Sequence, residues 1–125
     1  MAAYAFPKSA RVLRRSEYVE IREAGSSFAE GPLAASFRRR EPRPTRTEAP
    51  AAVARVGLTV SSKIGGAVER NRIKRRLREA VRLELAGLPA VDLVLVARAS
   101  AASASLAELR EWLRRAGLRM RNMNP

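Results

Sequence analysis

The run VERNRIKRRLREAVR, residues 68–82, carries seven basic side chains and two acidic ones. Guanidinium and ammonium groups at this density can bind a row of phosphates, because each contact neutralises a charge and releases a counterion. Apolar residues recur at every fourth position through this run and just beyond it: Ile73, Leu77, Val81 and Leu85. This spacing predicts a helix over about 67–87 with one buried face and one cationic face.

The cationic face of the predicted helix lacks the acidic residues that would neutralise it. A solvated helix face usually mixes charges, so that side chains four residues apart attract each other. Glu79 can pair with Arg75, but it cannot offset the remaining cations. We therefore predict that this face binds a polyanion and does more than keep the protein soluble. Its polar residues are Arg70, Asn71, Arg72, Lys74, Arg75, Arg78 and Arg82.

The whole chain shares this basic bias. Its 125 residues include 25 Lys and Arg against 12 Asp and Glu, which gives a formal net charge of +13. A compact chain with this charge repels itself, and a bound polyanion relieves the repulsion. The 46% hydrophobic content is enough for a packed core and excludes a disordered basic tail. Nucleic acid is the first candidate ligand. An anionic membrane is the second, although the apolar stripe has no Trp or Phe.

The residue types that are missing exclude several kinds of chemistry. The chain has no Cys and no His, which excludes disulfides, thiolate or imidazole metal ligands and histidine acid–base catalysis. No apolar run reaches the roughly 20 residues of a membrane span, and residues 1–15 lack the apolar core of a signal peptide. We therefore expect a soluble cytoplasmic protein. The aromatic content of 5% favours phosphate contacts on folded RNA over stacking on many bases.

The elements around the central helix indicate an α+β fold. Strands predicted at 54–62 and 91–97 flank the helix, which should therefore connect parallel neighbours in a four-stranded mixed sheet. The order is an α-β-β-β-α-β-α sandwich with helices packed on the sheet, in a single RNA-binding domain, 1–125. The other predicted segments are an extended basic arm at 1–15, a helix capped by Ser16 and ended by Gly25, two strands within 26–40, a Pro-rich loop at 41–52, a linker at 98–104, a last helix from a Ser105–Glu108 capping box to Gly117, and a flexible tail at 118–125.

The string GLTVSSKIGGAVERNRIKRRLREAVR, residues 57–82, resembles the protein subunit of bacterial ribonuclease P. Weaker similarity in LRRSEYVEIREAG and DLVLVARAS extends the resemblance, in order, over about 9–117. The family pattern V-S-x-K-x-G-x-A-V-x-R-N-R-x-K-R-x-x-R-E is matched at Val60, Ser61, Lys63, Gly65, Ala67, Val68, Arg70, Asn71, Arg72, Lys74, Arg75, Arg78 and Glu79.

This resemblance implies a protein that assists a catalytic RNA. The holoenzyme would remove the 5′ leader from precursor tRNA by endonucleolytic cleavage. Its RNA subunit would carry the catalytic Mg²⁺, and the protein would supply no catalytic residue and hold no metal alone. The expected partners are the RNA subunit and precursor tRNA, with no membrane, and the protein would be a monomer within the holoenzyme. The resemblance also implies a left-handed β-α-β crossover, although about 98% of such connections are right-handed.

The family assigns the basic helix to the catalytic RNA. This implies RNA contacts for the matched polar residues of 70–78 and for Lys63 just before them, and Arg82 lies on the same stripe. The departures at Ser62 and Gly66 replace a Lys and an Asn common in the family, and the lost Lys removes a phosphate contact. Five nearby arginines either replace that contact or belong to a solvated loop. They are Arg38, Arg39, Arg40, Arg43 and Arg46.

The family's central cleft holds the single-stranded leader, and Tyr18 matches an aromatic position there. Stacking on a leader base would contribute about 1–3 kcal/mol. Tyr18 could equally be a partly buried core residue. Many relatives have a second aromatic residue where this chain has Arg22, so we expect an ionic leader contact at that position. Phe37 alternates with Leu33 and is expected in the core.

Two other functions remain open on charge and size alone. A ribosomal or RNA-chaperone protein would bind RNA without any associated catalysis. An independent nuclease would need a general base or a metal-binding carboxylate cluster, and the twelve acidic residues form no obvious cluster in the sequence. The matched pattern at 60–79 favours the ribonuclease P subunit over both.

Overall fold

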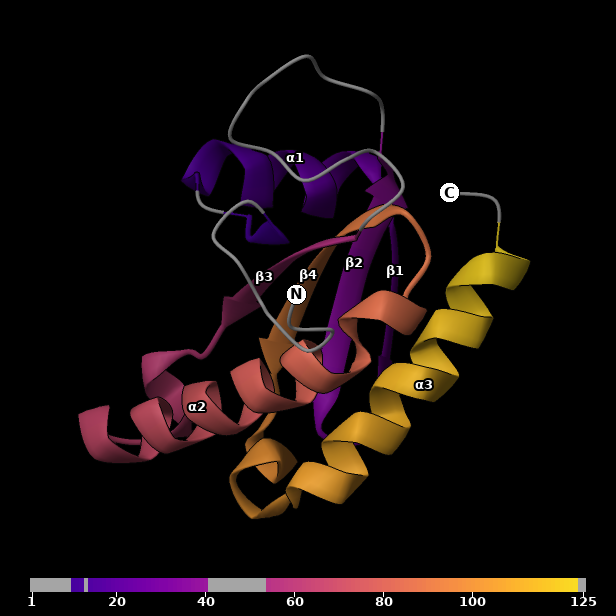
Figure 1. Cartoon of the computed structure of the whole chain (residues 1–125). Helices are drawn as coiled ribbons and strands as arrows, with labels where there is room; N and C mark the ends of the chain where they lie inside the picture. The colour runs from indigo at the N-terminus through magenta and orange to yellow at the C-terminus, as the bar shows by residue number, and fades with distance from the viewer. Residues whose placement is uncertain (1–9, 13, 41–53, 124–125) are drawn as a thin grey trace.

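A computed structural model of the chain describes residues 10–12, 14–40 and 54–123. In these residues three α-helices and four strands follow the predicted order α-β-β-β-α-β-α, which confirms the α+β fold (Figure 1). Short 3₁₀ segments join some of them: η2 (Ser62–Ile64), η3 (Leu85–Gly87) and η4 (Ala99–Ser103). The helices and strands are α1 (Arg15–Ala24), β1 (Ser26–Glu30), β2 (Leu33–Arg39), β3 (Arg55–Thr59), α2 (Ala67–Glu84), β4 (Val91–Ala97) and α3 (Leu106–Asn122).

The four described strands form one mixed sheet in the order β1-β2-β4-β3. β1 and β2 are antiparallel and meet at a turn in which Gly31 adopts a φ of 55°, a left-handed conformation that favours glycine. β2 and β4 are also antiparallel, whereas β3 and β4 are parallel, as predicted. In Figure 1 both parallel strands run downward, β3 lies to the left of β4, and α2 passes in front of the sheet. The crossover is therefore left-handed, as the family resemblance implied.

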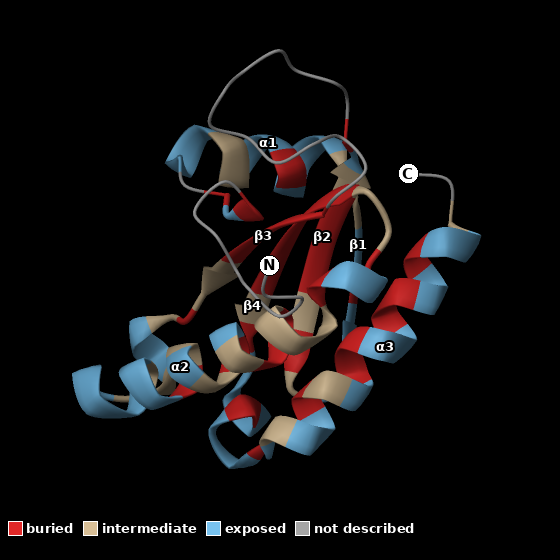
Figure 2. Cartoon of the chain, in the orientation of Figure 1, coloured by how far each residue is buried: buried red, intermediate tan, exposed pale blue. Residues whose placement is uncertain are grey.

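The helices cover both faces of the sheet. Along β4, Leu93 and Leu95 belong to the main core, whereas Val94 and Val96 belong to a small cluster with Ile21 of α1. This alternation follows from the two-residue period of a strand. α1 therefore lies on one face, and α2 and α3 pack together on the other. Figure 2 shows the buried strands between these layers.

α2 uses the predicted apolar stripe. Its four members are all buried, with exposures of 8% or less, and Phe37 of β2 is fully buried beside them, as expected. The α-helix ends at Glu84 and the chain continues through η3, so the predicted range of 67–87 covers both segments. Burying this stripe fixes which side of α2 faces solvent. The stripe consists of Ile73, Leu77, Val81 and Leu85.

Two predicted helix ends are wrong. α1 begins at Arg15 and has Arg14 at its N-cap with no side-chain cap, so Ser16 lies inside the first turn. Its start is set by tertiary pairing, because Val12 N–H donates to the Val56 carbonyl at 3.1 Å just before the helix. α3 does not end at Gly117 but continues to Asn122.

The predicted flexible tail at 118–125 is helical as far as Asn122. The reason is Met120, which is only 2% exposed and packs into the main core, so the last turn is held by burial. The capping box of Ser105 and Glu108 is confirmed at the other end of α3. The predicted linker at 98–104 contains η4.

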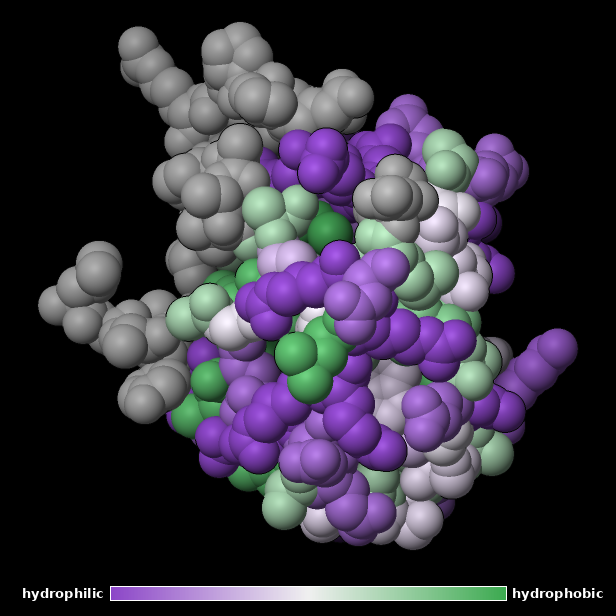
Figure 3. Space-filling model, turned by 90° about the vertical axis from the view of Figure 1, so that its right-hand side faces the viewer, coloured by the Kyte–Doolittle hydropathy of each residue, from purple (hydrophilic) through white to green (hydrophobic). Residues whose placement is uncertain are grey.

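Parts of the predicted arm and loop lie outside the described residues. These parts are 1–9, position 13 and 41–53, together with 124–125 at the end of the chain. Where the structure is described, none of the helices has the length and apolar character needed to cross a bilayer. Figure 3 views the molecule from the side of α3, where hydrophilic residues dominate and hydrophobic ones form small separate groups.

Candidate nucleic-acid interface

The solvent-facing side of α2 presents most of the predicted cations. Asn71, Arg72, Arg75 and Arg78 are exposed, and so is Lys63 in η2 at the entry to the helix. Arg70 and Lys74 are partly buried along one flank. The Nε of Arg70 is buried and has no hydrogen-bond partner among the described residues. The buried stripe on the opposite side holds these groups at fixed positions on one rigid helix.

Glu79 neutralises a different arginine from the one expected. It forms a short salt bridge with Arg82, three residues along α2, and not with Arg75. The hydrogen bond from Arg82 lowers the pKa of Glu79, which keeps the carboxylate charged. Arg82 is therefore half of a neutral pair, whereas Arg75 stays on the face as a net charge.

The remaining exposed cations of α2 are open to solvent. Within the part of the chain that the structure describes, Arg72, Arg75 and Arg78 form no ion pair and no side-chain hydrogen bond. Arg76 differs, because its Nη1 donates to the Ala104 carbonyl at 2.7 Å and ties α2 to the segment before α3. No pattern in the sequence indicated this structural role of Arg76. The open arginines can bind phosphate without first breaking an internal pair.

A cleft of about 210 Å³ lies between α1, the edge strand β3 and α2. It brings together Tyr18, which was predicted to bind the leader, and Lys74 and Arg78, which were predicted to bind the catalytic RNA. Arg22 is exposed on α1 but is not among the residues that line this cleft. The complete lining is Arg11, Val12, Tyr18, Val56, Leu58, Lys74 and Arg78.

Tyr18 lies over the backbone of β3 at the wall of this cleft. A Cβ built on Gly57 would be 2.7 Å from two atoms of the Tyr18 ring end, so only glycine leaves room for the ring in its present place. Burial raises the pKa of Tyr18, and a hydrogen bond with the backbone of Leu58 only partly opposes that shift. The phenol therefore stays neutral at physiological pH and adds no repulsion toward phosphate.

A second groove, of about 400 Å³, lies on the other flank of α2, where the start of α3 packs against it. Arg72 and Arg75 line it together with Arg76, Glu79 and Leu106. The cationic face therefore extends from the cleft at β3, across the exposed ridge of α2, to the groove beside α3. A single strand of phosphates or the groove of a folded RNA could contact it along this width.

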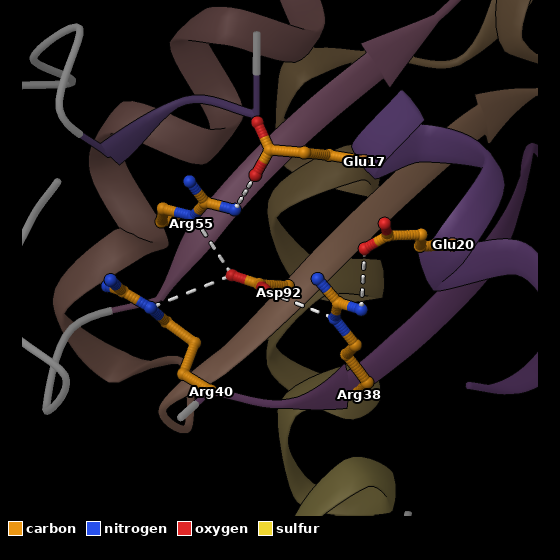
Figure 4. Close-up of polar contacts among 6 residues, drawn as sticks. All are labelled: Glu17, Glu20, Arg38, Arg40, Arg55 and Asp92. Carbon is orange, nitrogen blue, oxygen red and sulfur yellow. Dashed lines mark hydrogen bonds and ion pairs between the residues drawn. The ribbon is translucent and has the colours of Figure 1, made fainter. Parts of the chain in front are cut away.

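A buried charge network lies under α1, and the sequence reading missed it. Three residues occupy one row across three strands, because Arg38 and Arg55 are both register partners of Asp92. Arg55 Nε contacts Asp92 Oδ1 at 3.0 Å, and Arg38 Nε contacts Asp92 Oδ2 at 3.4 Å. From α1, Glu17 contacts Arg55 at 2.5 Å and Glu20 contacts Arg38 at 3.3 Å. Figure 4 shows Asp92 among three arginines, two of which are also linked to a glutamate, Arg55 to Glu17 and Arg38 to Glu20.

The hydrogen bonds of this network determine its charge state. Burial alone would lower the pKa of Arg55, but hydrogen bonds to Glu17 and Asp92 outweigh that effect and raise it. Arg40 is also buried and lies 3.6 Å from Asp92. Arg38 and Arg40 are therefore held by ion pairs within the fold, and the prediction of a solvated loop is wrong for both. Arg39 is exposed, and the arginines at 43 and 46 lie outside the described residues.

One signal in the sequence could have revealed this network. Asp92 interrupts the predicted strand VDLVLVA, whose other residues are all apolar. A carboxylate in such a strand requires buried partners of opposite charge. Among the described residues, no group of three or more acidic side chains could hold a metal ion. Several of the described acids instead pair with arginines, among them Glu17, Glu79 and Glu84.

Comparison of this sequence with known proteins points to one family. The sequence model of the family described as Ribonuclease P matches residues 6–121. A ribonuclease P protein component from Desulfosudis oleivorans is 37% identical over 114 residues, which cover 90% of this chain and 87% of the relative. One from Dehalococcoides mccartyi is 42% identical over 100 residues, which cover 79% of this chain and 74% of the relative.

Solved structures share the fold. The RNase P protein of Staphylococcus aureus superposes with a TM-score of 0.72 at 23% identity, over 94% of this chain and all of that one. The RNase P protein of Thermotoga maritima, solved in complex with 1-(4-fluorophenyl)-2-thiourea, has a TM-score of 0.68 at 25% identity, over 83% of this chain and 98% of that one. Because the family model spans nearly the whole sequence and relatives exceed 30% identity over most of it, the chain belongs to the ribonuclease P protein family.

Proposed function

We propose that this member of the ribonuclease P protein family binds the catalytic RNA through α2 and the 5′ leader of precursor tRNA through the cleft beside Tyr18. The observation that supports this most directly is the open cationic ridge. Arg72, Arg75 and Arg78 carry net charge without an internal partner among the described residues, on a helix whose other face is buried. Such a surface costs stability through self-repulsion unless a polyanion binds it.

The residues that bind the catalytic RNA in this proposal are Lys63 and polar residues of α2. Arg82 carries less weight among them than the sequence suggested. Arg82 contributes least, because Glu79 offsets its charge. Lys74 and Arg78 lie where the ridge meets the cleft, so they can neutralise phosphates close to the leader. Arg22 is exposed on α1 but does not line the cleft. It would therefore contact only a part of the leader that lies outside the cleft. The set is Lys63, Arg70, Asn71, Arg72, Lys74, Arg75 and Arg78.

In this proposal the protein positions RNA and neutralises charge, and the RNA subunit performs the chemistry. Mg²⁺ held by the RNA subunit would activate the water that cuts the phosphodiester. Protein cations would replace some of the screening ions between RNA segments, so the Mg²⁺ requirement should fall. The cleft would bind the leader, so precursor binds more tightly than mature tRNA, which is then released. The protein would act as a monomer within a cytoplasmic holoenzyme.

The first test is reconstitution with a bacterial ribonuclease P RNA at low Mg²⁺. The proposal predicts faster cleavage of precursor tRNA at the single 5′ maturation position when the wild-type protein is added. A ribosomal or RNA-chaperone role would give RNA binding without this stimulation. Cleavage by the purified protein without the RNA subunit would contradict the proposed division of labour.

The second test measures the salt dependence of binding to the RNA subunit. Arg75→Ala should make the log–log slope shallower by up to about 0.9, the value for one lost contact with a B-DNA phosphate, and by less for irregular RNA. Arg115→Ala is the matched control, since this α3 arginine is also exposed and its substitution removes the same charge. Equal slopes for the two variants would show that the α2 ridge is not the contact surface.

A further inference from the structure

The attachment of α1 to the sheet depends on few apolar contacts. Within α1, all of which the structure describes, Ile21 is the one buried residue. It packs in a small cluster with Val12 and Val94 on the face of the sheet opposite the main core, and the partly buried Tyr18 and Val96 pack against this cluster. One buried aliphatic side chain and one partly buried tyrosine fix where α1 lies, but they give few contacts that oppose rotation about the helix axis. The ion pairs of Glu17 and Glu20 therefore add to what sets the orientation of α1.

Two successive contacts connect α1 to the edge strand β3. Glu17 accepts a hydrogen bond from Arg55 at 2.5 Å, and the next residue along α1, Tyr18, lies with its ring against Gly57. Arg55 and Gly57 are two residues apart in β3 and so point to the same face of the sheet. The ion pair and the ring contact are therefore neighbours on both elements, and a movement of the first displaces the second.

Asp92 fixes this arrangement from below. Its two carboxylate oxygens hold Arg55 and Arg38, which in turn hold Glu17 and Glu20 on α1 (Figure 4). The two glutamates are three residues apart and lie on the same side of the helix, so the pair of contacts opposes rotation of α1. Asp92 and Arg55 are nearly inaccessible, with exposures of 6% and 4%. Water therefore competes poorly for these bonds.

We propose that Asp92, Arg55 and Glu17 are positioning residues for leader binding. They touch no RNA, but they hold the Tyr18 ring against Gly57 at the angle at which a leader base can stack on it. This inference rests on the proposed function of the cleft. It adds a role for three residues that lie beneath α1 and that no RNA contact would identify. The network also neutralises Glu17 beside the cleft, where a free carboxylate would repel phosphate.

The experiment uses the holoenzyme reconstituted with a bacterial ribonuclease P RNA. The measured quantity is the affinity for precursor tRNA with a leader divided by the affinity for the same tRNA without one. Asp92→Asn and Glu17→Gln should each lower this ratio by about 5- to 150-fold, the range expected for loss of one stacked base. Glu23→Gln is the matched control, because Glu23 is exposed on α1 and makes no ion pair among the described residues. It should leave the ratio unchanged.

A double-mutant cycle separates positioning from a general loss of structure. In a Tyr18→Ala background, Asp92→Asn should lower the ratio no further, because Asp92 acts through that ring. Additive effects would overturn the proposal. If Asp92→Asn does not fold, Glu17→Gln carries the same cycle, since it leaves the contacts of Asp92 with its arginines in place. An unchanged ratio in a folded Glu17→Gln variant would also overturn the proposal.

The outcomes distinguish this inference from the proposed function beneath it. If the wild-type holoenzyme binds leader-bearing and leaderless tRNA equally, the leader function fails and the positioning role fails with it. If the wild type prefers the leader and the two variants keep that preference, only the positioning role fails. Affinity of each variant for the RNA subunit alone should remain within about twofold of wild type, a change of less than about 0.5 kcal/mol.

Discussion

Gly57→Ala perturbs the proposed leader site without removing any side chain. The substitution places a methyl carbon 2.7 Å from the end of the Tyr18 ring. Carbon atoms pack at about 3.5–4.0 Å, so the ring must retreat by about 0.8 Å or more. The obstacle is one movable side chain and not backbone, so α1 can stay in place while Tyr18 swings away from β3.

The expected effect on binding follows from that displacement. A stacked base contributes about 1–3 kcal/mol, and a ring pushed off its support loses most of it. Affinity for precursor tRNA with a leader should therefore fall by about 5- to 150-fold. Gly57 has no positive φ, so alanine introduces no backbone strain. It should even stabilise the fold slightly, by about 0.4–1 kcal/mol, which offsets part of the cost of moving the ring.

The assay compares leader-bearing and leaderless tRNA with the holoenzyme, and urea unfolding of the free protein measures stability. Gly87→Ala is the control, because a Cβ at that position meets no atom within 4 Å. We expect Gly57→Ala to reduce leader-dependent affinity while the free energy of unfolding stays within about 1 kcal/mol of wild type. If Gly57→Ala bound the leader as tightly as Gly87→Ala, the contact of Tyr18 with β3 would have no part in leader binding.

Three further predictions concern stability and titration. Met120→Ala should cost about 2–5 kcal/mol in urea unfolding, because it empties a core position, whereas exposed Leu118→Ala should change stability by less than about 0.5 kcal/mol. Burial alone would raise the pKa of Glu84, but hydrogen bonds from two α3 arginines outweigh it and lower that pKa. Its stabilising contribution is therefore complete above the ordinary value of 4.5 and is lost as the pH falls through the lowered value, so Glu84→Gln should flatten the acid limb of a stability–pH profile. Burial raises the pKa of Tyr18, so ultraviolet titration should show one tyrosine ionising above the ordinary 10.0, and this signal should be missing in Tyr18→Phe. Its contribution to stability is complete below 10.0 and is lost as the pH rises through the raised pKa of the folded state.

The central helix and the last strand were predictable because their patterns are local. Ile73 and Leu77 repeat at the helical period, and the cations between them must then face solvent. The run VDLVLVA has the length and the branched aliphatic residues of a strand that is buried on both faces of a sheet. In both cases one short segment contains all the information that its structure requires.

The predictions that failed depended on partners distant in the sequence. Gly117 is a reasonable helix end until Met120 finds its place in a core built from other elements. Arg38 and Arg40 read as cations beside a loop, but Asp92, more than fifty residues later, holds both of them. Glu79 could have paired with Arg75 or with Arg82, and the arrangement of side chains on the folded helix selected Arg82.

The sequence by itself determined the charge, the helix that presents it and the family, because these depend on residue types and on spacings within a few turns. Only the tertiary structure decided which cations remain open and how Tyr18 is held. Those outcomes depend on which side chains meet across the sheet, and Asp92 meets Arg38 and Arg55 only when three strands align in register. Long-range pairing of this kind has no local signature beyond a single carboxylate in an apolar strand.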